Sequence, residues 1–201
     1  EDGGFDTNFD LPAINAKGER LTYVLEALDP TTRLRGQALA TLTPGKKTEV
    51  QVRLLGKGEL VVEVRDAAGA PVSNANVEVA QATFPGEFFS GTTDAEGRLR
   101  LGGLFEGVYT ARARKVVGAT AVLGSSGVSV GGGGVATARV VLAASGTIRG
   151  RFLASDRETP IPDAQVGVAG AGFATTGADG SFELVGVPLG SFRVQAQDPV
   201  N

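Results

Sequence analysis

An internal repeat is the feature that most constrains what this chain can fold into. Residues 58–72 match residues 146–161, and the two blocks begin 88 residues apart. Residues 97–113 match residues 180–196, which lie 83 residues further along. Because the offset changes only between blocks, the copies differ in the length of their loops. A repeat of this size is enough for one small domain per copy, so we expect a row of similar domains.

The start of the chain matches the late part of the same repeat. Residues 23–27 align with residues 109–113, and residues 50–54 align with residues 138–142. The chain therefore divides into three predicted parts. Residues 1–56 are the C-terminal part of one β-sandwich repeat, residues 57–144 are a complete β-sandwich repeat, and residues 145–201 are the N-terminal part of a further repeat.

Apolar and polar residues alternate within each copy. Leu60, Val62 and Val64, for example, stand in a run that also holds Glu59 and Glu63. A period of two is that of a β-strand with one buried face, and Gly, Pro and Asp separate the runs as turn residues do. About seven short strands in roughly 85 residues are typical of an immunoglobulin-like or transthyretin-like (prealbumin-like) β-sandwich. We therefore predict an all-β fold of tandem sandwich repeats.

The residues shared by the two copies resemble a known family. The pattern, complete in the middle repeat, reads G-x-(L/I)-x-x-x-(V/F), then G-x-P-(V/I)-x-x-A-x-V-x-V, then D-x-x-G-x-(L/F)-x-L-x-G-(L/V)-x-x-G-x-(Y/F)-x-(A/V)-x-A. This pattern is similar to that of the carboxypeptidase regulatory-like family and covers the middle repeat and most of the third. The resemblance implies a transthyretin-like β-sandwich, often found in tandem in large bacterial extracellular proteins. It leaves the function open among spacers, adhesin stalks, glycan-binding accessories and appendages of peptidases or transporters.

Composition excludes much of catalysis. The chain contains no His, Cys, Met or Trp. Imidazole bases, thiolate nucleophiles, disulfides and the usual ligands of zinc, iron and copper are therefore missing together. We predict that the chain is not an enzyme and binds no cofactor.

Charge and hydropathy exclude two classes of partner. The net charge is −3, and basic and acidic residues are interspersed, so there is no electrostatic footprint for nucleic acid or for anionic lipid. No run approaches the roughly 20 apolar residues of a membrane span. We expect no nucleic-acid partner and no membrane insertion within this window.

Three short segments superficially resemble catalytic motifs. Residues 124–127 lack the G-x-S-x-G spacing and are expected to be a loop between strands, and residues 45–48 lack the upstream glycine of a phosphate loop and are expected to be a hairpin turn. Asp156, Glu158 and Asp163 could supply the two carboxylates of a glycosidase. Because the matching loop of the middle repeat has different residues, a solvated loop explains them better.

Acidic residues offer three candidate cation sites. The turns at residues 94–97 and 179–180 have too few carboxylates for the six or more ligands of calcium, and an Asp that caps its own turn explains them. Asp2, Asp6 and Asp10 lie close together near the start of the chain, where a solvated chain end is the simpler interpretation. We predict no metal site.

Three aromatic residues are the best candidates for a contact surface. Phe84, Phe88 and Phe89 fall between the second and third predicted strands of the complete repeat. They could form a platform for a ligand or glycan, because flat rings bury a large area at small entropic cost. Packing against the core or a neighbouring domain is the other interpretation, and we predict it.

These observations favour a non-catalytic structural region, a stalk or fibre, of a secreted or cell-surface bacterial protein, with a role related to adhesion. The expected partners are neighbouring repeats of the same protein and other copies of it. One alternative is a module that binds a glycan or protein. Another is an accessory domain of a secreted peptidase or glycosidase.

The alignment of the three copies leaves both end domains incomplete. Residues 145–201 lack the two closing strands that align with residues 37–42 and 50–54. Three resolutions remain open: the window is cut from a continuous chain, the end domains close by a different topology, or the tail of one molecule completes the head of the next. The cut window needs no special device.

Overall fold

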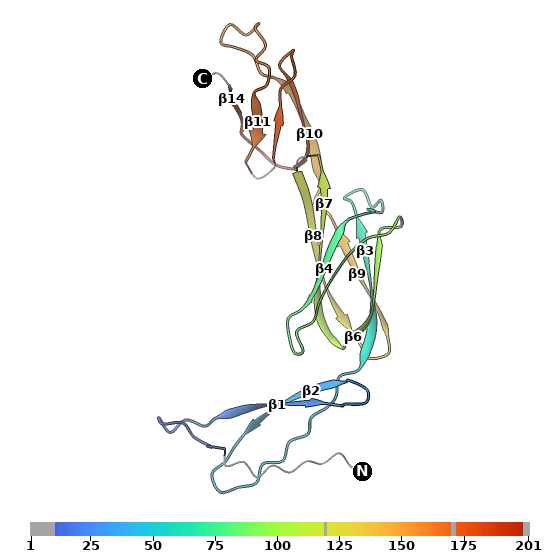
Figure 1. Ribbon diagram of the computed structural model, residues 1–201, viewed down its shortest axis with the longest axis vertical. Coiled ribbons are helices and arrows are strands. Elements are labelled where there is room, and N and C mark those ends of the chain that lie inside the picture. The colour runs from blue at the N-terminus through green and yellow to red at the C-terminus, as the bar shows by residue number, and fades with distance from the viewer. Residues whose placement is uncertain (1–10, 119, 170–171, 199–201) are drawn as a thin grey trace. The chain divides into compact units, whose positions relative to one another are not determined.

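The computed structural model describes residues 11–118, 120–169 and 172–198. These residues form fourteen β-strands and no helix, which confirms the all-β prediction. None of them forms a helix long and apolar enough to cross a membrane. The chain divides into two compact units, residues 1–56 and residues 57–201, which are described separately (Figure 1).

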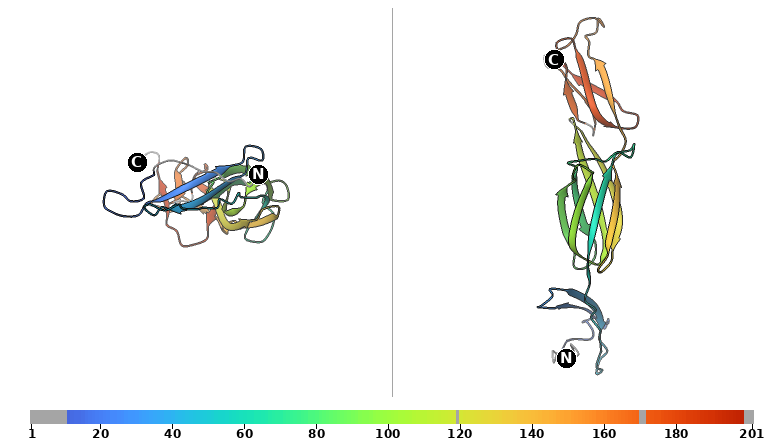
Figure 2. Two further views of the ribbon diagram at one scale, coloured as in Figure 1. Left: turned by 90° about the horizontal axis from the view of Figure 1, so that it is seen from below. Right: turned by 90° about the vertical axis from the view of Figure 1, so that its right-hand side faces the viewer.

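Seven strands between residues 57 and 141 form a β-sandwich (Figures 1 and 2). One sheet has the order β6-β3-β9 and the other the order β5-β4-β7-β8. The first strand, β3, pairs antiparallel with β6 and parallel with β9. The strands are β3 (Lys57–Arg65), β4 (Asn76–Gln81), β5 (Phe88–Thr92), β6 (Arg98–Phe105), β7 (Gly107–Val117), β8 (Thr120–Val130) and β9 (Val135–Val141).

The core of this sandwich comes from the alternation seen in the sequence. Leu60, Val62 and Val64 of β3 are fully buried and lie in one cluster with Val77 and Val79 of β4. Fifteen buried residues make up that cluster. Burying a Val or Leu side chain contributes about 1.5–3 kcal/mol, so this core is the main source of stability of the sandwich.

Residues 145–198 form five strands that repeat the order of β3 to β7. They are β10 (Ser145–Arg151), β11 (Gln165–Val168), β12 (Phe173–Thr175), β13 (Ser181–Pro188) and β14 (Val194–Gln197). β10 pairs with β13, and β11 pairs with β12 and β14. The register between β10 and β13 shifts between Gly146 and Thr147, and that between β3 and β6 shifts between Gly58 and Glu59. A bulge therefore occurs at the same place in both segments.

The core of residues 145–198 is much smaller than that of the sandwich. Its buried cluster has three members, Val168, Leu184 and Val187. Within the described residues, β10 has no counterpart of β9 beside it, and β14 has no counterpart of β8. The face that β14 would bury against those strands stays open, and all four residues of β14 are exposed.

The two strands of the described part of unit 1 form an antiparallel hairpin. β1 (Thr22–Leu28) pairs with β2 (Arg35–Thr41), with Tyr23 opposite Ala40 and Ala27 opposite Gly36. β7 and β8 pair in the matching register, because Tyr109 is opposite Val128 and Ala113 is opposite Gly124. Tyr23, Leu25 and Ala27 are only half-buried, since the described part of this unit has no second layer over them.

The strand predicted at residues 50–54 does not form. Only a single bridge is present there, between Gly36 and Leu54. The segment nevertheless lies where the alignment puts it: Leu55 N–H donates to Arg35 O at 2.6 Å, and 88 residues later Ala143 N–H donates to Leu123 O at 2.8 Å. The counterpart strand β9 is held by β3, and no described residue of unit 1 supplies that partner.

A buried threonine links the strands in both segments of unit 2. The Thr93 hydroxyl donates to Val72 O at 2.6 Å and accepts from Ala75 N–H at 2.9 Å. Thr176 makes the same pair of bonds, to Ile161 O at 2.7 Å and from Ala164 N–H at 2.9 Å. Both threonines are buried, so in each segment one side chain satisfies two backbone groups that water cannot reach.

Candidate functional site

The three predicted aromatic residues do not form a common platform. Phe88 and Phe89 are consecutive on β5 and point to opposite faces of the sheet. Phe88 is 63 % exposed, whereas Phe89 is partly buried and packs against the core of its own sandwich. Phe84 is half-buried in the loop before β5. The period of two therefore separates side chains that are adjacent in sequence.

The loop that carries Phe84 is anchored by Glu87 at its end. One carboxylate oxygen of Glu87 accepts from Phe105 N–H at 2.9 Å and lies 2.7 Å from the hydroxyl oxygen of Tyr109. That hydroxyl, fully buried, also lies 2.8 Å from Phe105 O and donates its single hydrogen to one acceptor at a time. Burial, and then the hydrogen bond and charge of Glu87, raise the pKa of Tyr109 well above its ordinary value.

The outer side of the sheet β5-β4-β7-β8 presents three rows of exposed side chains, which we call the polar face. Each row crosses the four strands in register. The first row is Phe88, Ala80, Thr110 and Gly127; the second is Ser90, Glu78, Arg112 and Ser125; and the third is Thr92, Asn76, Arg114 and Leu123.

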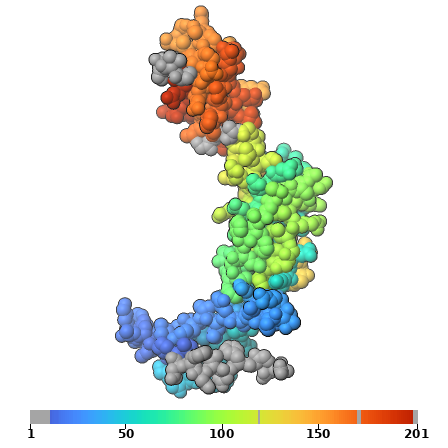
Figure 3. Space-filling view, viewed as in Figure 1, coloured from blue at the N-terminus to red at the C-terminus, as the bar shows by residue number. Residues whose placement is uncertain are grey.

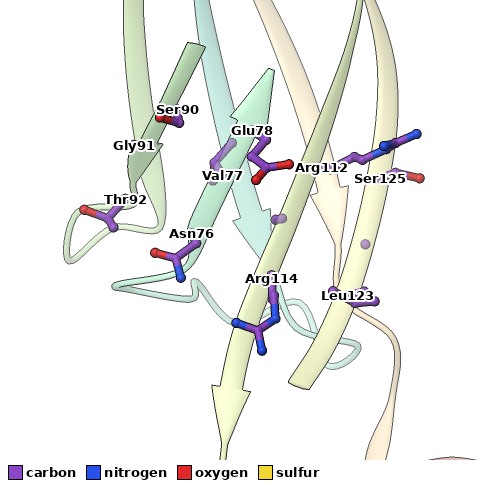
Figure 4. A pocket seen from close by; sticks show the side chains of 12 residues that line it. Asn76, Val77, Glu78, Ser90, Gly91, Thr92, Arg112, Arg114, Leu123 and Ser125 are labelled. Atoms are coloured by element: carbon purple, nitrogen blue, oxygen red, sulfur yellow. The ribbon is translucent and has the colours of Figure 1, made fainter. Parts of the chain in front are cut away.

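The second and third rows line a shallow groove of about 820 Å³ (Figure 4). Arg112 and Arg114 lie two residues apart on β7, and neither has an ion-pair partner among the described residues. Their guanidinium groups diverge in Figure 4, where that of Arg112 extends toward β8. Glu78, opposite Arg112 across the strands, is the only acidic residue of the face. The groove therefore offers two guanidinium groups beside hydroxyl, amide and carboxylate groups.

In the two acidic turns and the acidic loop, aspartate carboxylates accept hydrogen bonds from neighbouring residues of the same turn or loop. Asp179 accepts from Ser181 N–H and from the Ser181 hydroxyl, and these bonds hold its pKa below the ordinary value. Asp156 accepts from the Thr159 hydroxyl and from two backbone N–H groups, with the same effect on its pKa. Asp94 accepts from two backbone N–H groups of its turn. In each case local capping occupies the carboxylate.

The remaining candidates fall in different places. The prediction of a loop at residues 124–127 is wrong. These residues lie in the middle of β8, because Ser125 and Ser126 continue the alternation of that strand. Residues 45–48 follow Thr43, whose carbonyl accepts from Lys46 N–H in a turn, and no strand follows. Asp2, Asp6 and Asp10 lie outside the described residues. Across residues 11–118, 120–169 and 172–198, no three acidic side chains cluster as a metal site would require.

Sequence reasoning missed the polar face and the buried threonines. Arg112 and Arg114 were visible as the polar positions of an alternating run, but which residues lie beside them depends on the order of the strands. A signal for the threonines was present. Thr176 follows Thr93 by 83 residues, the same offset as the block that begins at Gly97.

Comparison with known protein families gives a match in the middle of the chain. A family model for the carboxypeptidase regulatory-like domain matches residues 59–143. No curated protein matches the chain.

Several solved structures are partly similar to this chain. A streptococcal ancillary pilin has a TM-score of 0.47 and 15 % identity, over 81 % of this chain and 61 % of that one. The TIE protein of Bacillus anthracis has a TM-score of 0.38 and 16 % identity, over 88 % and 39 % of the two chains. A minor pilin of Streptococcus agalactiae has a TM-score of 0.42 and 15 % identity, over 69 % and 82 %. This chain thus spans less than two thirds of the first two, and with TM-scores below 0.5 the likeness supports no conclusion about function.

Proposed function

We propose that the chain is a non-catalytic spacer, starting from the match of residues 59–143 to the carboxypeptidase regulatory-like domain. It is a stretch of stalk or fibre from a secreted or cell-surface bacterial protein that serves adhesion. The family resemblance supports the extracellular setting, because such domains often occur in tandem in large bacterial surface proteins. The physical support is the connection between the sandwich and residues 145–198.

That connection is short, and each of its three residues makes a backbone hydrogen bond. Only residues 142–144 separate β9 from β10. Leu142 N–H donates to Arg65 O and Ala143 N–H donates to Leu123 O, both at 2.8 Å, and Ala144 O accepts from Leu189 N–H at 3.2 Å. A linker whose backbone groups are paired on both sides has little freedom to swing.

The hairpin β7–β8 buttresses the connection. Both strands have eleven residues and continue beyond the part of β7 that pairs with β4. At the tip, the buried Thr120 hydroxyl lies 2.8 Å from Val185 O and 3.0 Å from Val117 O. Figure 3 shows this tip as a narrow yellow bridge that reaches the orange segment.

Gly186 makes room for the tip of the hairpin β7–β8. A Cβ atom at Gly186 would lie 2.2 Å from the Thr120 hydroxyl oxygen and 2.8 Å from Val117 O. Gly103, at the matching bulge of β6, has a similar φ of +75° but would meet nothing within 4 Å. The close approach of Thr120 and Val117 therefore requires a glycine at position 186, and no such approach occurs at the matching Gly103.

Distance measurements between spin labels test the spacer proposal. Because the chain has no cysteine, Thr137→Cys and Arg157→Cys supply two clean labelling sites, one in each segment. We expect a single narrow distance distribution that Gly186→Leu broadens. Thr120→Val, which removes the hydroxyl without added bulk, broadens it less.

Gly103→Leu is the matched control, since it imposes the same backbone strain away from the connection. It should leave the distribution narrow. A broad distribution in the parent chain, or equal broadening by Gly103→Leu and Gly186→Leu, would overturn the rigid connection and with it the spacer.

A further inference from the structure

We propose that the polar face binds an anionic oligosaccharide, one whose sugar rings carry carboxylates. This inference goes beyond the spacer role and does not depend on it. The ligand would lie across β5, β4, β7 and β8, with a ring over Phe88 and its acidic groups at Arg112 and Arg114. The argument rests on the chemistry of the three rows and on the state of the strands beneath them.

The charges indicate the acidic groups. Two guanidinium groups without ion partners in the described chain belong to one strand, on residues whose Cα atoms are about 7 Å apart along it. Arginine binds carboxylates through two parallel hydrogen bonds. Glu78 lies opposite Arg112 on the neighbouring strand, and its carboxylate would repel a densely charged polyanion. A ligand with spaced carboxylates therefore fits better than one with a charge on every unit.

The neutral groups indicate a ligand rich in hydroxyls. Ser90, Thr92 and Ser125 each carry a hydroxyl that both donates and accepts, and Asn76 does the same through its amide. All four side chains are exposed and make no hydrogen bond in the described structure. Glu78 adds an acceptor for hydroxyl donors. The groups are thus free to form hydrogen bonds with sugar hydroxyls.

Phe88 supplies a flat apolar surface at one end of the face. Its ring is 63 % exposed, and its row is otherwise made of small residues, Ala80, Thr110 and Gly127. Strand spacings place it roughly 12 Å from Arg112. A ligand of one ring cannot span that distance, whereas an extended oligosaccharide can.

The backbone argues against an extended peptide as the ligand. Peptides that bind sheets add a strand at an unpaired edge, where backbone groups are free. β4 and β7, which carry Glu78, Asn76 and both arginines, are central strands that are paired on both sides. The polar face thus offers side chains alone, which suits a ligand that presents hydroxyls and carboxylates.

Titration of the full chain with a galacturonic acid trimer, followed by amide NMR shifts, tests the proposal. We expect shifts confined to β4, β5, β7 and β8, and no comparable shifts with the neutral galactose trimer. Arg112→Gln and Arg114→Gln should each weaken binding about tenfold, the effect of losing one charge-assisted hydrogen-bond pair. Phe88→Ala should weaken binding of the same trimer.

Arg139→Gln is the matched control, because Arg139 is an exposed arginine of the other sheet, on β9. It should leave binding unchanged. The proposal is overturned if the acidic trimer causes no shifts, if the neutral trimer binds equally well, if Arg139→Gln weakens binding as much as Arg114→Gln, or if a triglutamate peptide binds this face and the acidic trimer does not. Gly186→Leu leaves this titration unchanged, so the spacer and the binding face fail separately.

Discussion

At the scale of single residues, the two segments of unit 2 are held by the same device. A threonine hydroxyl satisfies a buried carbonyl and a buried N–H that belong to the turn between the first two strands. Unpaired buried backbone groups are costly, so Thr93 and Thr176 are worth more than their small side chains suggest.

Thr93→Val should destabilise the sandwich by about 2 kcal/mol, because it leaves Val72 O and Ala75 N–H without this partner. Chemical unfolding monitored by circular dichroism measures the change. Thr93→Ser, which keeps the hydroxyl, should cost much less. Thr137→Val, at an exposed position of β9, should change stability by no more than about 0.5 kcal/mol.

Gly97→Ala should cost at least about 3 kcal/mol, because two effects add. The residue has a φ of +75°, and a Cβ atom would lie 2.7 Å from Val64 O and 2.9 Å from Val72 N. Gly69→Ala has the backbone effect alone, since nothing lies within 4 Å of its Cβ, and should cost about 1 kcal/mol. Equal losses in the two variants would show that the close approach is relieved without strain.

The buried Tyr109 should make stability fall at alkaline pH. Its pKa is raised in the folded state, so the stabilisation is complete below the pKa of the unfolded tyrosine, about 10. Above that pH the unfolded chain loses a proton that the folded chain keeps, and stability falls by up to about 1.4 kcal/mol per pH unit. Unfolding at pH 9 to 11.5 measures this slope, and Tyr109→Phe should flatten it. An unchanged slope in that variant would contradict the assignment to Tyr109.

At the scale of elements, the alternation of apolar residues predicted the strands where a neighbour is present to hold them. The runs in β3, β4 and β7 became strands with buried inner faces. Residues 50–54 alternate equally well but form a single bridge. A period of two reports which face a strand would bury, and it says nothing about whether a partner strand is there.

The same limit applies to the candidate site. Sequence singled out Phe88 as a contact residue, and its exposure leaves it available. The residues beside it on the polar face, such as Glu78 and Arg112, come from β4 and β7, and the order of strands in the sheet brings them together. That order depends on long-range pairing, which no local pattern contains.

Core size predicts how stability is distributed along unit 2. The cluster of buried residues has fifteen members in the sandwich and three in residues 145–198. A few buried side chains at about 1.5–3 kcal/mol each make a large difference in local opening. Hydrogen exchange in β3, β4 and β7 should be at least about a hundredfold slower than in β10 to β14. Equal protection in both segments would contradict this expectation.

At the scale of the whole molecule, residues 145–198 leave open some apolar side chains whose counterparts in the sandwich are buried. Phe192 and Val194 are 40 % and 41 % exposed, whereas their counterparts Tyr109 and Ala111 are fully buried. In the sandwich, β8 and β9 cover those positions, and nothing described covers them in residues 145–198. Open sheet edges beside exposed apolar faces promote association.

The isolated 201-residue chain should therefore associate as its concentration rises. Light scattering between about 10 and 500 µM checks this, since edge contacts of this kind are weak. Val194→Lys should reduce the association, because a charge at an edge opposes strand addition. Val135→Lys, at an exposed position of β9, is the control and should have less effect. A chain that is folded and strictly monomeric throughout this range would contradict the prediction.

The parallel pairing of β3 with β9 has a mechanical consequence. These are the first and last strands of the sandwich, and they lie side by side over seven residue pairs from Glu59 to Arg65. Tension applied through Lys57 and Val141 pulls the two strands past each other in shear. Their hydrogen bonds lie across the direction of the load and must break together instead of one after another. A sandwich with this strand pairing should withstand a higher force than its free energy of unfolding alone suggests. It does so in the direction in which a tethered chain is pulled.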